Sequence, residues 1–464
     1  MYGVNVGLEI GKRALLSQQL LLNLTGHNIA NVNTPGFTRQ QAIVRSTDPY
    51  SSIKGNFGTG VEIVSIIRLR TLFLDEQYRE ESQSLGRWQT LSQGWGQIEM
   101  IYAEPSDSGL SSIMDNFWNA WQDLSVNPES MAARAAVKEQ GNIVTNAFNH
   151  MAEQLTEFQQ SLDEDIQKTV QLINNIGYQI AALNDSIETA ELSGHKANDL
   201  RDRRDYLIDE LSQLVNVNTL EQPSGNYTVF LGSMMLVDGG DVQELETVIR
   251  DQGSAIIHDV EFVNSTAAPD ISNGKLAGLI ETRDEIIMGR LQELDELALG
   301  LVEKINEVHR QGYNLYNETG IDFFDKNTTG AADIKLDDMI LSDEANIAAS
   351  LNGEPGDNSN VLQIAGLRFE LTMRNGSASF GDFYNSLIGI IGLRAREAEN
   401  NSVNQESLVF HIENNRQSLE GVSLDEEMTN MIKYEHAYQA AARVITTMDA
   451  ALDTIINRMG LVGR

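Results

Sequence analysis

"SLDEEMTNMIKYEHAYQAAARVITTMDAALDTIINRMG", residues 423–460, is the stretch that decides the fold. Neither Gly nor Pro interrupts residues 422–459, and Ser423 with Glu426 fits a capping box at the start of a helix. Apolar side chains recur every seven residues, which predicts one long helix with a coiled-coil type of seam. The first column of the seam is Leu424, Met431, Tyr438, Ile445, Leu452 and Met459, and the second is Tyr434, Ala441, Met448, Ile455 and Val462.

The first thirty residues carry a weaker version of this pattern. Its main column is spaced by seven, and a more polar column runs beside it; the two are Leu8, Leu15, Leu22 and Ile29, and Val4, Gly11, Gln18 and Thr25. Each end of the chain thus predicts a heptad helix, and neither helix has an obvious partner in its own neighbourhood.

The N-terminal helix leads into "NIANVNTPGF", residues 28–37. Asn28, Asn31 and Asn33 can bond backbone groups at the end of a helix and tolerate left-handed conformations. The segment from Thr34 through Pro35 and Gly36 to Phe37 suits a type II turn, with Pro second and Gly third. This stretch predicts a hinge-like exit from the helix, whose neutral amides can pack against neighbouring subunits without burying charge.

Helical patterns dominate between the two ends. Residues 110–124 place their apolar side chains on one face, and residues 144–187 keep three-four spacing for more than forty residues. The latter predicts a rod-like helix of about 60 Å or more, at about 1.5 Å per residue. A returning helix is expected over residues 197–215, and a third long one over residues 276–308.

Strand signals are confined. Residues 226–240 favour a hairpin around Gly232 and Ser233, residues 246–263 suggest further strands, and residues 38–70 also indicate strands and turns. We therefore expect a mainly α fold with paired N- and C-terminal heptad helices, a long-helix bundle domain and a small β insert domain. The expected domains are a terminal helical assembly domain with a short β and loop segment (1–70 plus 400–464), a body (71–220 plus 270–399) and the insert (221–269).

Composition excludes several classes of function. The 464 residues include 33 basic and 67 acidic side chains, and the net charge of -34 disfavours nucleic acid and anionic lipid as partners. The absence of cysteine rules out disulfides and thiolate chemistry. The start of the chain lacks the pattern of a secretory leader, and no apolar run approaches a membrane span of about 18 residues. Sec-type secretion and membrane anchoring are therefore not expected.

No residues suggest catalysis, a cofactor or a metal. "KGNFGTG", residues 54–60, lacks the order of a phosphate-binding loop, and the seven histidines show no zinc-ligand spacing. The charges of residues 199–210 indicate a salt-bridged outer face of a helix rather than paired catalytic carboxylates. Residues 325–333 and 354–360 are acidic but do not match EF-hand spacing, so plain loops are favoured over calcium sites. An enzyme is the weaker hypothesis.

What remains is an architecture in which the end helices pair with each other and with those of neighbouring copies, as in a subunit of a tube or ring. Residues 21–40 and 421–460 resemble the N- and C-terminal motifs of bacterial flagellar rod, hook and hook-associated proteins. "GLSSIMDNFWNAWQDLSVNPES" (109–130) and "NDLRDRRDYLIDELSQLVNV" (198–217) are most similar to the hook-associated members that form the first junction between hook and filament. The resemblance is weakest at the β insert, which looks short.

The resemblance implies an extracellular structural subunit that is exported by the flagellar type III apparatus with an export chaperone. It also implies a ring on the distal hook, contacting hook protein and a second junction protein that leads to the flagellin filament. Another axial subunit, of the hook or the distal rod, is the alternative. The predicted assembly interface is Leu8, Leu15, Leu22, Asn28, Ile29, Asn31, Asn33, Pro35, Gly36, Phe37, Leu424, Met431, Tyr434, Tyr438, Ile445, Met448, Leu452 and Ile455. Its helices are expected to fold only when neighbouring copies bury them.

Overall fold

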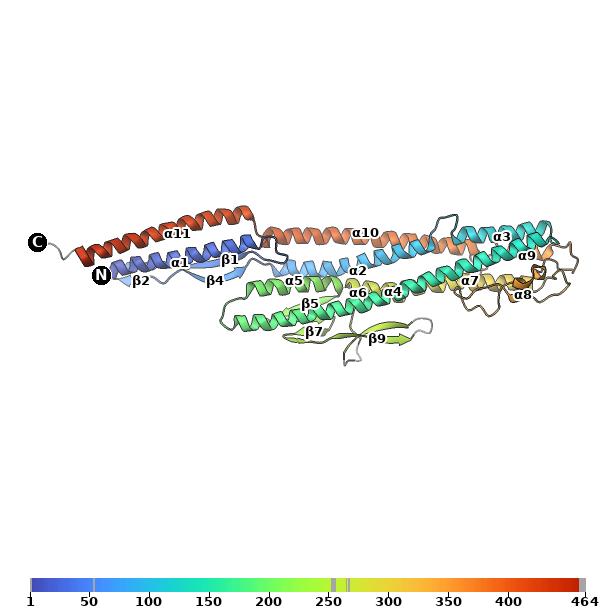
Figure 1. Ribbon diagram of the computed structural model, residues 1–464, viewed down its shortest axis with the longest axis horizontal. Coiled ribbons are helices and arrows are strands. Elements are labelled where there is room, and N and C mark those ends of the chain that lie inside the picture. Colours follow the sequence, from blue (N-terminus) through green and yellow to red (C-terminus); the bar gives the residue numbers. More distant parts are fainter. Residues whose placement is uncertain (1, 53–54, 252–255, 264, 266–267, 459–464) are drawn as a thin grey trace.

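The structure is a computed structural model that describes residues 2–52, 55–251, 256–263, 265 and 268–458. It is mainly α-helical, as predicted, and forms an elongated rod with both chain ends at one end (Figure 1). Its α-helices are α1 (Tyr2–Ala30), α2 (Leu72–Tyr102), α3 (Leu110–Val126), α4 (Met131–Glu191), α5 (Asn198–Leu214), α6 (Gly274–Glu281), α7 (Met288–His309), α8 (Asp338–Ser342), α9 (Ser359–Gly366), α10 (Phe380–Glu420) and α11 (Leu424–Asp453).

The structure also contains short π-helical and 3-10 turns and several strands. A π-helical turn (Thr282–Ile287) joins α6 to α7, another (Thr454–Arg458) continues α11, and a 3-10 turn (Glu344–Asn346) follows α8. The strands are β1 (Gln40–Ser46), β2 (Tyr50–Ser52), β3 (Gly55–Phe57), β4 (Val61–Arg68), β5 (Val217–Glu221), β6 (Tyr227–Leu231), β7 (Met234–Asp238), β8 (Asp241–Val242), β9 (Leu245–Asp251) and β10 (Ile256–Phe262). Among the residues that the structure describes, no helix is both long and apolar enough to cross a lipid bilayer.

The body of the rod is a bundle built on α4. This helix has 61 residues, so it is about 90 Å long at about 1.5 Å per residue, and the Ser130 side chain accepts a hydrogen bond from the Ala133 N–H at its start. The predicted helix over residues 276–308 is confirmed as α6, the π turn and α7 in succession. Aromatic side chains of α3 and of the loop after α7 form the distal core, and these include Phe117, Trp121, Phe323 and Phe324.

The β insert packs on α4 as one four-stranded antiparallel sheet, β5-β6-β7-β8, and one two-stranded ribbon of β9 and β10. The predicted hairpin around Gly232 is confirmed, because β6 and β7 pair on either side of this residue and its φ is +58°. Strand β5 begins at Val217, before the expected boundary at 221. It pairs along its whole length with β6, so the insert starts earlier than the turn signals indicated.

Helix α10 also crosses an expected boundary. It runs unbroken through residue 400 to Glu420 and packs along α2, so these residues belong to the body and not to the terminal domain. Its C-terminal half buries only a narrow stripe that includes Ala398, Val409 and Ile412. Most of its other side chains are polar, and a weak apolar pattern of this kind gives little sign of a long helix.

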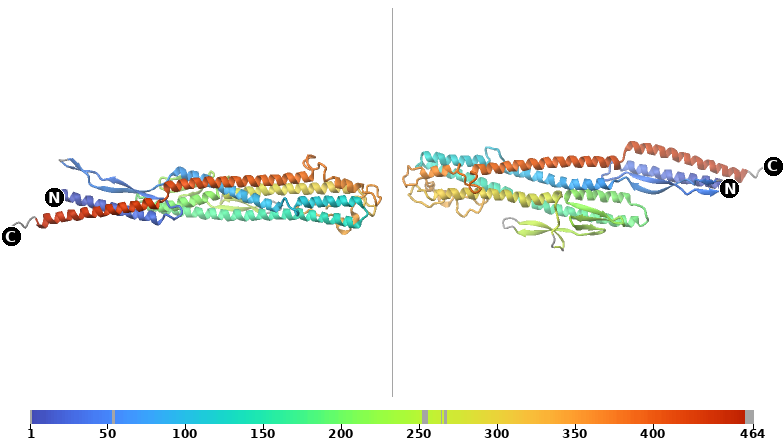
Figure 2. Two further views of the ribbon diagram at one scale, coloured as in Figure 1. Left: turned by 90° about the horizontal axis from the view of Figure 1, so that it is seen from above. Right: turned by 180° about the vertical axis from the view of Figure 1, so that it is seen from behind.

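The terminal unit, defined here as residues 1–70 and 421–464, contains α1, α11 and the arm (residues 40–68). In the arm, β1 pairs antiparallel with β4, and β2 pairs with β3 at the tip. Figure 2 shows the arm diverging from α1 towards its tip. Among the described residues of the terminal unit, only two hydrophobic side chains are buried, those of Leu21 and Ala441. The terminal unit therefore has almost no hydrophobic core of its own.

Candidate assembly interface

Helices α1 and α11 lie side by side, so the two predicted seams face each other within one chain (Figure 1). Side chains of α11 pack against two glycines of α1. A Cβ atom on Gly11 would lie 2.8 Å from Cγ1 of Ile445, and one on Gly7 would lie 2.9 Å from Cε of Met448. The absence of side chains at these two positions lets α11 approach the backbone of α1.

The predicted seam residues differ in burial. Most are partly buried in the single chain: Leu8, Leu15, Leu22, Ile29, Met431, Tyr434, Tyr438, Ile445, Met448 and Leu452. Leu424 and Ile455 are instead 46% and 38% exposed. Met459 and Val462, which complete the predicted columns, lie outside the described residues.

The deepest positions of α1 are not those of the leucine column. Gly11, Ser17, Leu21, Thr25 and Asn28 are buried, and of these Gly11 and Thr25 belong to the more polar column of the heptad. A search for apolar side chains at heptad positions gives little weight to glycine and threonine. The close contacts between α1 and α11 were therefore not predicted from the sequence. The available signal was the pair of glycines one helical turn apart at positions 7 and 11.

Asn28 joins three elements at the end of α1. Its Nδ2 donates to the Gln40 carbonyl oxygen at 3.0 Å, and its Oδ1 accepts from the Gln40 N–H at 3.1 Å. The same amide nitrogen donates to Oε2 of Glu427 at 3.3 Å. One buried side chain thus holds the start of the arm to α1 and α11, and these polar groups satisfy one another away from water.

The turn that follows has the predicted geometry. The Phe37 N–H donates to the Thr34 carbonyl at 3.2 Å and Gly36 has φ of +73°, as a type II turn with Pro35 in second position requires. A Cβ on Gly36 would lie 2.7 Å from Cβ of Tyr206, so the turn also packs closely on α5.

The other two asparagines of this stretch differ from expectation. Asn31 donates to the carbonyl oxygen of His27 at 3.0 Å, as a residue at a helix end should, whereas Asn33 is exposed. Neither these two nor Asn28 has a positive φ, so none of them adopts the left-handed conformation that asparagine tolerates. Gly36 alone supplies the left-handed residue of this turn.

Where the terminal unit meets the body, eight charged side chains form an ionic joint: Arg68, Arg70, Arg79, Arg416, Asp75, Asp202, Asp205 and Asp209. Arg68 Nη1 lies 2.8 Å from both Asp202 Oδ1 and Asp205 Oδ2, and Arg416 Nη2 lies 2.9 Å from Asp209 Oδ2. Burial would raise the pKa of Asp205, but the neighbouring guanidinium groups of Arg70 and Arg68 hold it below the ordinary value. Asp205 is therefore a buried carboxylate that stays charged.

The joint corrects the prediction for residues 199–210. The expected salt bridges are present, but the aspartates at 202, 205 and 209 lie on a buried face of α5 and not on an outer one. Their arginine partners come from the arm, α2 and α10, which are far away in the sequence. The spacing of three and four residues between the aspartates did place them on one face, but it could not reveal the arginines.

In the two acidic loops, residues 325–333 and 354–360, aspartate side chains accept hydrogen bonds from backbone N–H groups. Asp333 accepts from the N–H groups of Thr329 and Gly330, and Asp357 accepts from that of Leu351. Over the described residues, no three His, Asp or Glu side chains gather in a way that could hold a metal ion. This arrangement agrees with plain loops.

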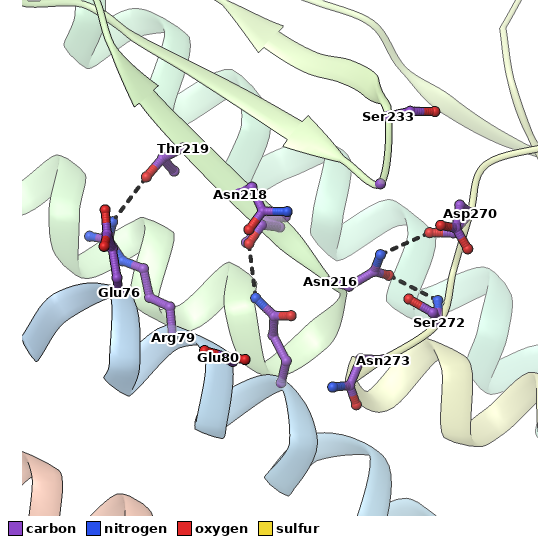
Figure 3. Close-up of a pocket in the computed structure, with 13 residues that line it drawn as sticks. Glu76, Arg79, Glu80, Asn216, Asn218, Thr219, Ser233, Asp270, Ser272 and Asn273 are labelled. Carbon is purple, nitrogen blue, oxygen red and sulfur yellow. Dashed lines mark hydrogen bonds between the residues drawn. The ribbon is translucent and has the colours of Figure 1, made fainter. Parts of the chain in front are cut away.

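A polar groove of about 710 Å³ lies between α2 and β5 (Figure 3). Asn216 bonds the backbone of Asp270 and Ser272 at 2.8 and 3.1 Å, and Gln83 donates to the Val217 carbonyl at 2.9 Å. Gln83 holds the start of β5 to α2, and Asn216 holds it to the segment that precedes α6.

Comparison with known proteins gives the family. Flagellar hook-associated protein 1 of Bacillus subtilis (strain 168) is 36% identical, and the alignment covers 99% of this chain and 99% of that one. This chain belongs to the flagellar hook-associated protein 1 family. Hook-associated protein 1 of Escherichia coli (strain K12) is 26% identical over 96% of this chain and 98% of its own.

Domain and structure comparisons agree with the hook-associated protein 1 family. Residues 95–324 match the family described as flagellar hook-associated protein FlgK helical domain. Residues 8–38 match the family of flagella basal body rod proteins, and residues 416–459 match the flagellar basal body rod FlgEFG protein C-terminal family. The structure of the flagellar hook junction protein FlgK from Burkholderia pseudomallei has the same fold, with a TM-score of 0.64 at 16% identity over 74% of this chain and 100% of that one.

The resemblance inferred from the terminal motifs is thereby confirmed, and this hook-associated protein is a structural component of the flagellum. The division between the families matches the structure. The two rod-type families cover most of α1 and all of α11 with the end of α10, and the hook-associated family covers the end of α2, α3 to α7 and the insert.

Proposed function

We propose that this protein forms the junction ring between hook and filament, outside the cell, and that filament growth depends on it. The observation that carries the proposal is the incomplete terminal unit. It buries only Leu21 and Ala441 among its described hydrophobic side chains, and leaves others such as Leu16, Met428 and Ile432 more than half exposed. Burying one such side chain on a neighbouring copy contributes roughly 1.5–3 kcal/mol.

The proposed mechanism couples folding to assembly. The chain leaves the cell through the flagellar type III apparatus, accompanied inside the cell by an export chaperone, with its terminal segments largely unfolded. Most of the stability of a protein helix comes from packing of its apolar face, so α1 and α11 are weakly stable when these faces are uncovered. On the hook, neighbouring copies cover α1 and α11, hook protein lies below, and a second junction protein above leads to the flagellin filament.

A hook or distal rod subunit is the second candidate, because rod-type families match both ends of the chain. The body argues for the junction. We expect a hook subunit to carry β-rich outer domains, whereas here the body is a bundle of long helices around α4. The helical match over residues 95–324 favours the same choice.

Immunogold electron microscopy of a deletion strain that expresses either the wild type or a variant tests the proposal. We expect wild-type label only at the hook–filament boundary, and bare hooks with shed flagellin when the gene is absent. Ile445→Asp should behave like the deletion, because it places a carboxylate against Gly11. Its neighbour Thr446 is exposed, so Thr446→Asp should restore filaments.

The outcomes separate the candidates. Label along the whole hook or within the rod would move the protein to another segment of the flagellum. Normal filaments with Ile445→Asp would contradict the seam as the assembly interface, even if the label stayed at the boundary. Circular dichroism of purified Ile445→Asp should retain the helical signal of the body, which excludes general unfolding as the cause.

A further inference from the structure

The arm exposes apolar side chains on its outer face. Gln41 pairs with Ile67 and Ile43 with Ser65, so Ile43 and Ile67 share one face of the two-stranded ribbon. They are 44% and 36% exposed, and Val64, at the bulge next to the Ile43–Ser65 pair, is 47% exposed. A two-stranded ribbon with an uncovered apolar face is marginally stable in water, so the arm needs a cover.

The tip of the arm has the same character. Tyr50 lies directly opposite Phe57 across the β2–β3 pair, and their side chains are 48% and 51% exposed. Aromatic cross-strand pairs stabilise a ribbon, but these two still present much of their surface to solvent. The tip therefore adds a further exposed apolar pair to the arm.

A second exposed patch, the α11 strip, lies at the start of α11. Leu424, Met428 and Ile432 are spaced by four residues, so they share one flank of the helix, and they are 46%, 56% and 55% exposed. A pocket of about 220 Å³ lies where α1, β1 and α11 meet. Residues such as Ala42 and Tyr434 line this pocket, whereas the exposed apolar side chains of the α11 strip and those of Ile43, Val64 and Ile67 do not.

Charge points to a second copy of this chain as the partner of both patches. The terminal unit carries eleven basic and nine acidic residues, whereas residues 71–420 carry 22 basic and 58 acidic ones. The charged side chains of the arm are Arg45, Lys54, Arg68, Asp48 and Glu62, so its net charge is only +1, and Arg68 is paired within the ionic joint. Two copies can therefore bring their terminal units together without the repulsion that their bodies exert.

We propose that the outer face of the arm of one copy packs on the α11 strip of the next copy around the ring. This inference rests on the proposed junction function and names the contact that closes the ring. The contact is heterologous, since each copy offers two different patches, and repetition of such a contact produces a ring or a helix. It also covers the two largest exposed apolar features described above for the terminal unit.

Cysteine cross-linking between copies tests the contact, because the natural chain contains no cysteine. Cells should express two versions together, one with Ile43→Cys and the other with Met428→Cys, and isolated flagella should then be mildly oxidised. We expect a disulfide-linked dimer of this protein only when both versions are present. Replacing Met428→Cys with Lys433→Cys, an exposed position on another flank of α11, should reduce the dimer at least tenfold.

The experiment should be repeated with Val64→Cys in place of Ile43→Cys. If both pairs gave normal filaments but no dimer, the proposed contact would be wrong and the junction function would stand. A cross-link to a protein of different mass would also overturn it. Ile43→Asp and Ser46→Asp give an independent reading, because both place a carboxylate in β1 but only the first replaces an exposed apolar side chain. We expect at least tenfold fewer filaments with Ile43→Asp than with Ser46→Asp, and equal numbers would contradict the proposal.

Discussion

His309 is the buried titratable group whose bonding depends most clearly on one protonation state. Its Nδ1 lies 2.7 Å from the carbonyl oxygen of Ile321, and its Nε2 lies 2.9 Å from the backbone nitrogen of Ala348. Only the neutral ring with its proton on Nδ1 can donate to the first group and accept from the second. Burial lowers the pKa of His309 to about 4, because the charged ring would lose its hydration.

Acid should therefore weaken the body through this residue. The pKa is about 4 in the folded state and about 6.5 in the unfolded state, so the unfolded state binds more protons between these values. Stability is complete above about pH 6.5 and is lost as the pH falls towards 4. When the pH falls from 7 to 5, the free energy of unfolding measured in urea should decrease by about 2 kcal/mol more in the wild type than in His309→Gln. His411 is exposed on α10, so His411→Gln should lose as much unfolding free energy as the wild type. An equal decrease in all three proteins would contradict this explanation.

At the scale of elements, the contact between α1 and α11 depends on a missing side chain. Gly11→Ala should separate the helices, because the added Cβ would lie 2.8 Å from Cγ1 of Ile445. Gly26 lies on the same helix, and among the described residues a Cβ there would meet no atom within 4 Å. Both changes raise helix propensity by about 1 kcal/mol, so propensity cancels in the comparison.

We expect Gly11→Ala to reduce the number of filaments per cell at least tenfold, and Gly26→Ala to leave it unchanged or higher. Counting filaments by electron microscopy in a complemented deletion strain measures the difference. If the two variants behaved alike, the close approach of α1 and α11 would not matter for assembly. Gly7→Ala should have a smaller effect, because the atom that its Cβ would meet is the flexible end of Met448.

Elements with strong apolar repeats could be predicted from the sequence, and those with polar surfaces could not. α4, α11 and the β6–β7 hairpin follow directly from spacing and from turn residues. The extension of α10 beyond residue 400 was not predicted, because this half buries few apolar side chains, among them Val409 and Ile412. The turn at Gly36 was predicted from its local chemistry, whereas the ionic joint was not, because its arginines and aspartates come together only in the folded chain.

At the scale of the whole molecule, the excess of negative charge lies in the body and not in the terminal unit. Residues 71–420 carry 36 more acidic than basic side chains, and the terminal unit carries two more basic than acidic ones. A ring places many such bodies side by side, so their mutual repulsion opposes assembly, while the terminal units, with a net charge of only +2, hold it together. The screening length is about 8 Å at 0.15 M salt and about 30 Å at 0.01 M, so dilute salt strengthens this repulsion.

Filaments should therefore detach from purified hooks severalfold faster in 0.01 M than in 0.15 M sodium chloride at pH 7. Electron microscopy of hooks with and without filaments over time gives the rate. A triple variant, Glu139→Gln, Glu153→Gln and Glu157→Gln, removes three exposed charges from α4 and should detach more slowly than the wild type in dilute salt, but at the same rate in 0.15 M. Faster detachment at the higher salt concentration would instead mean that ion pairs between copies, and not buried apolar side chains, hold the ring together.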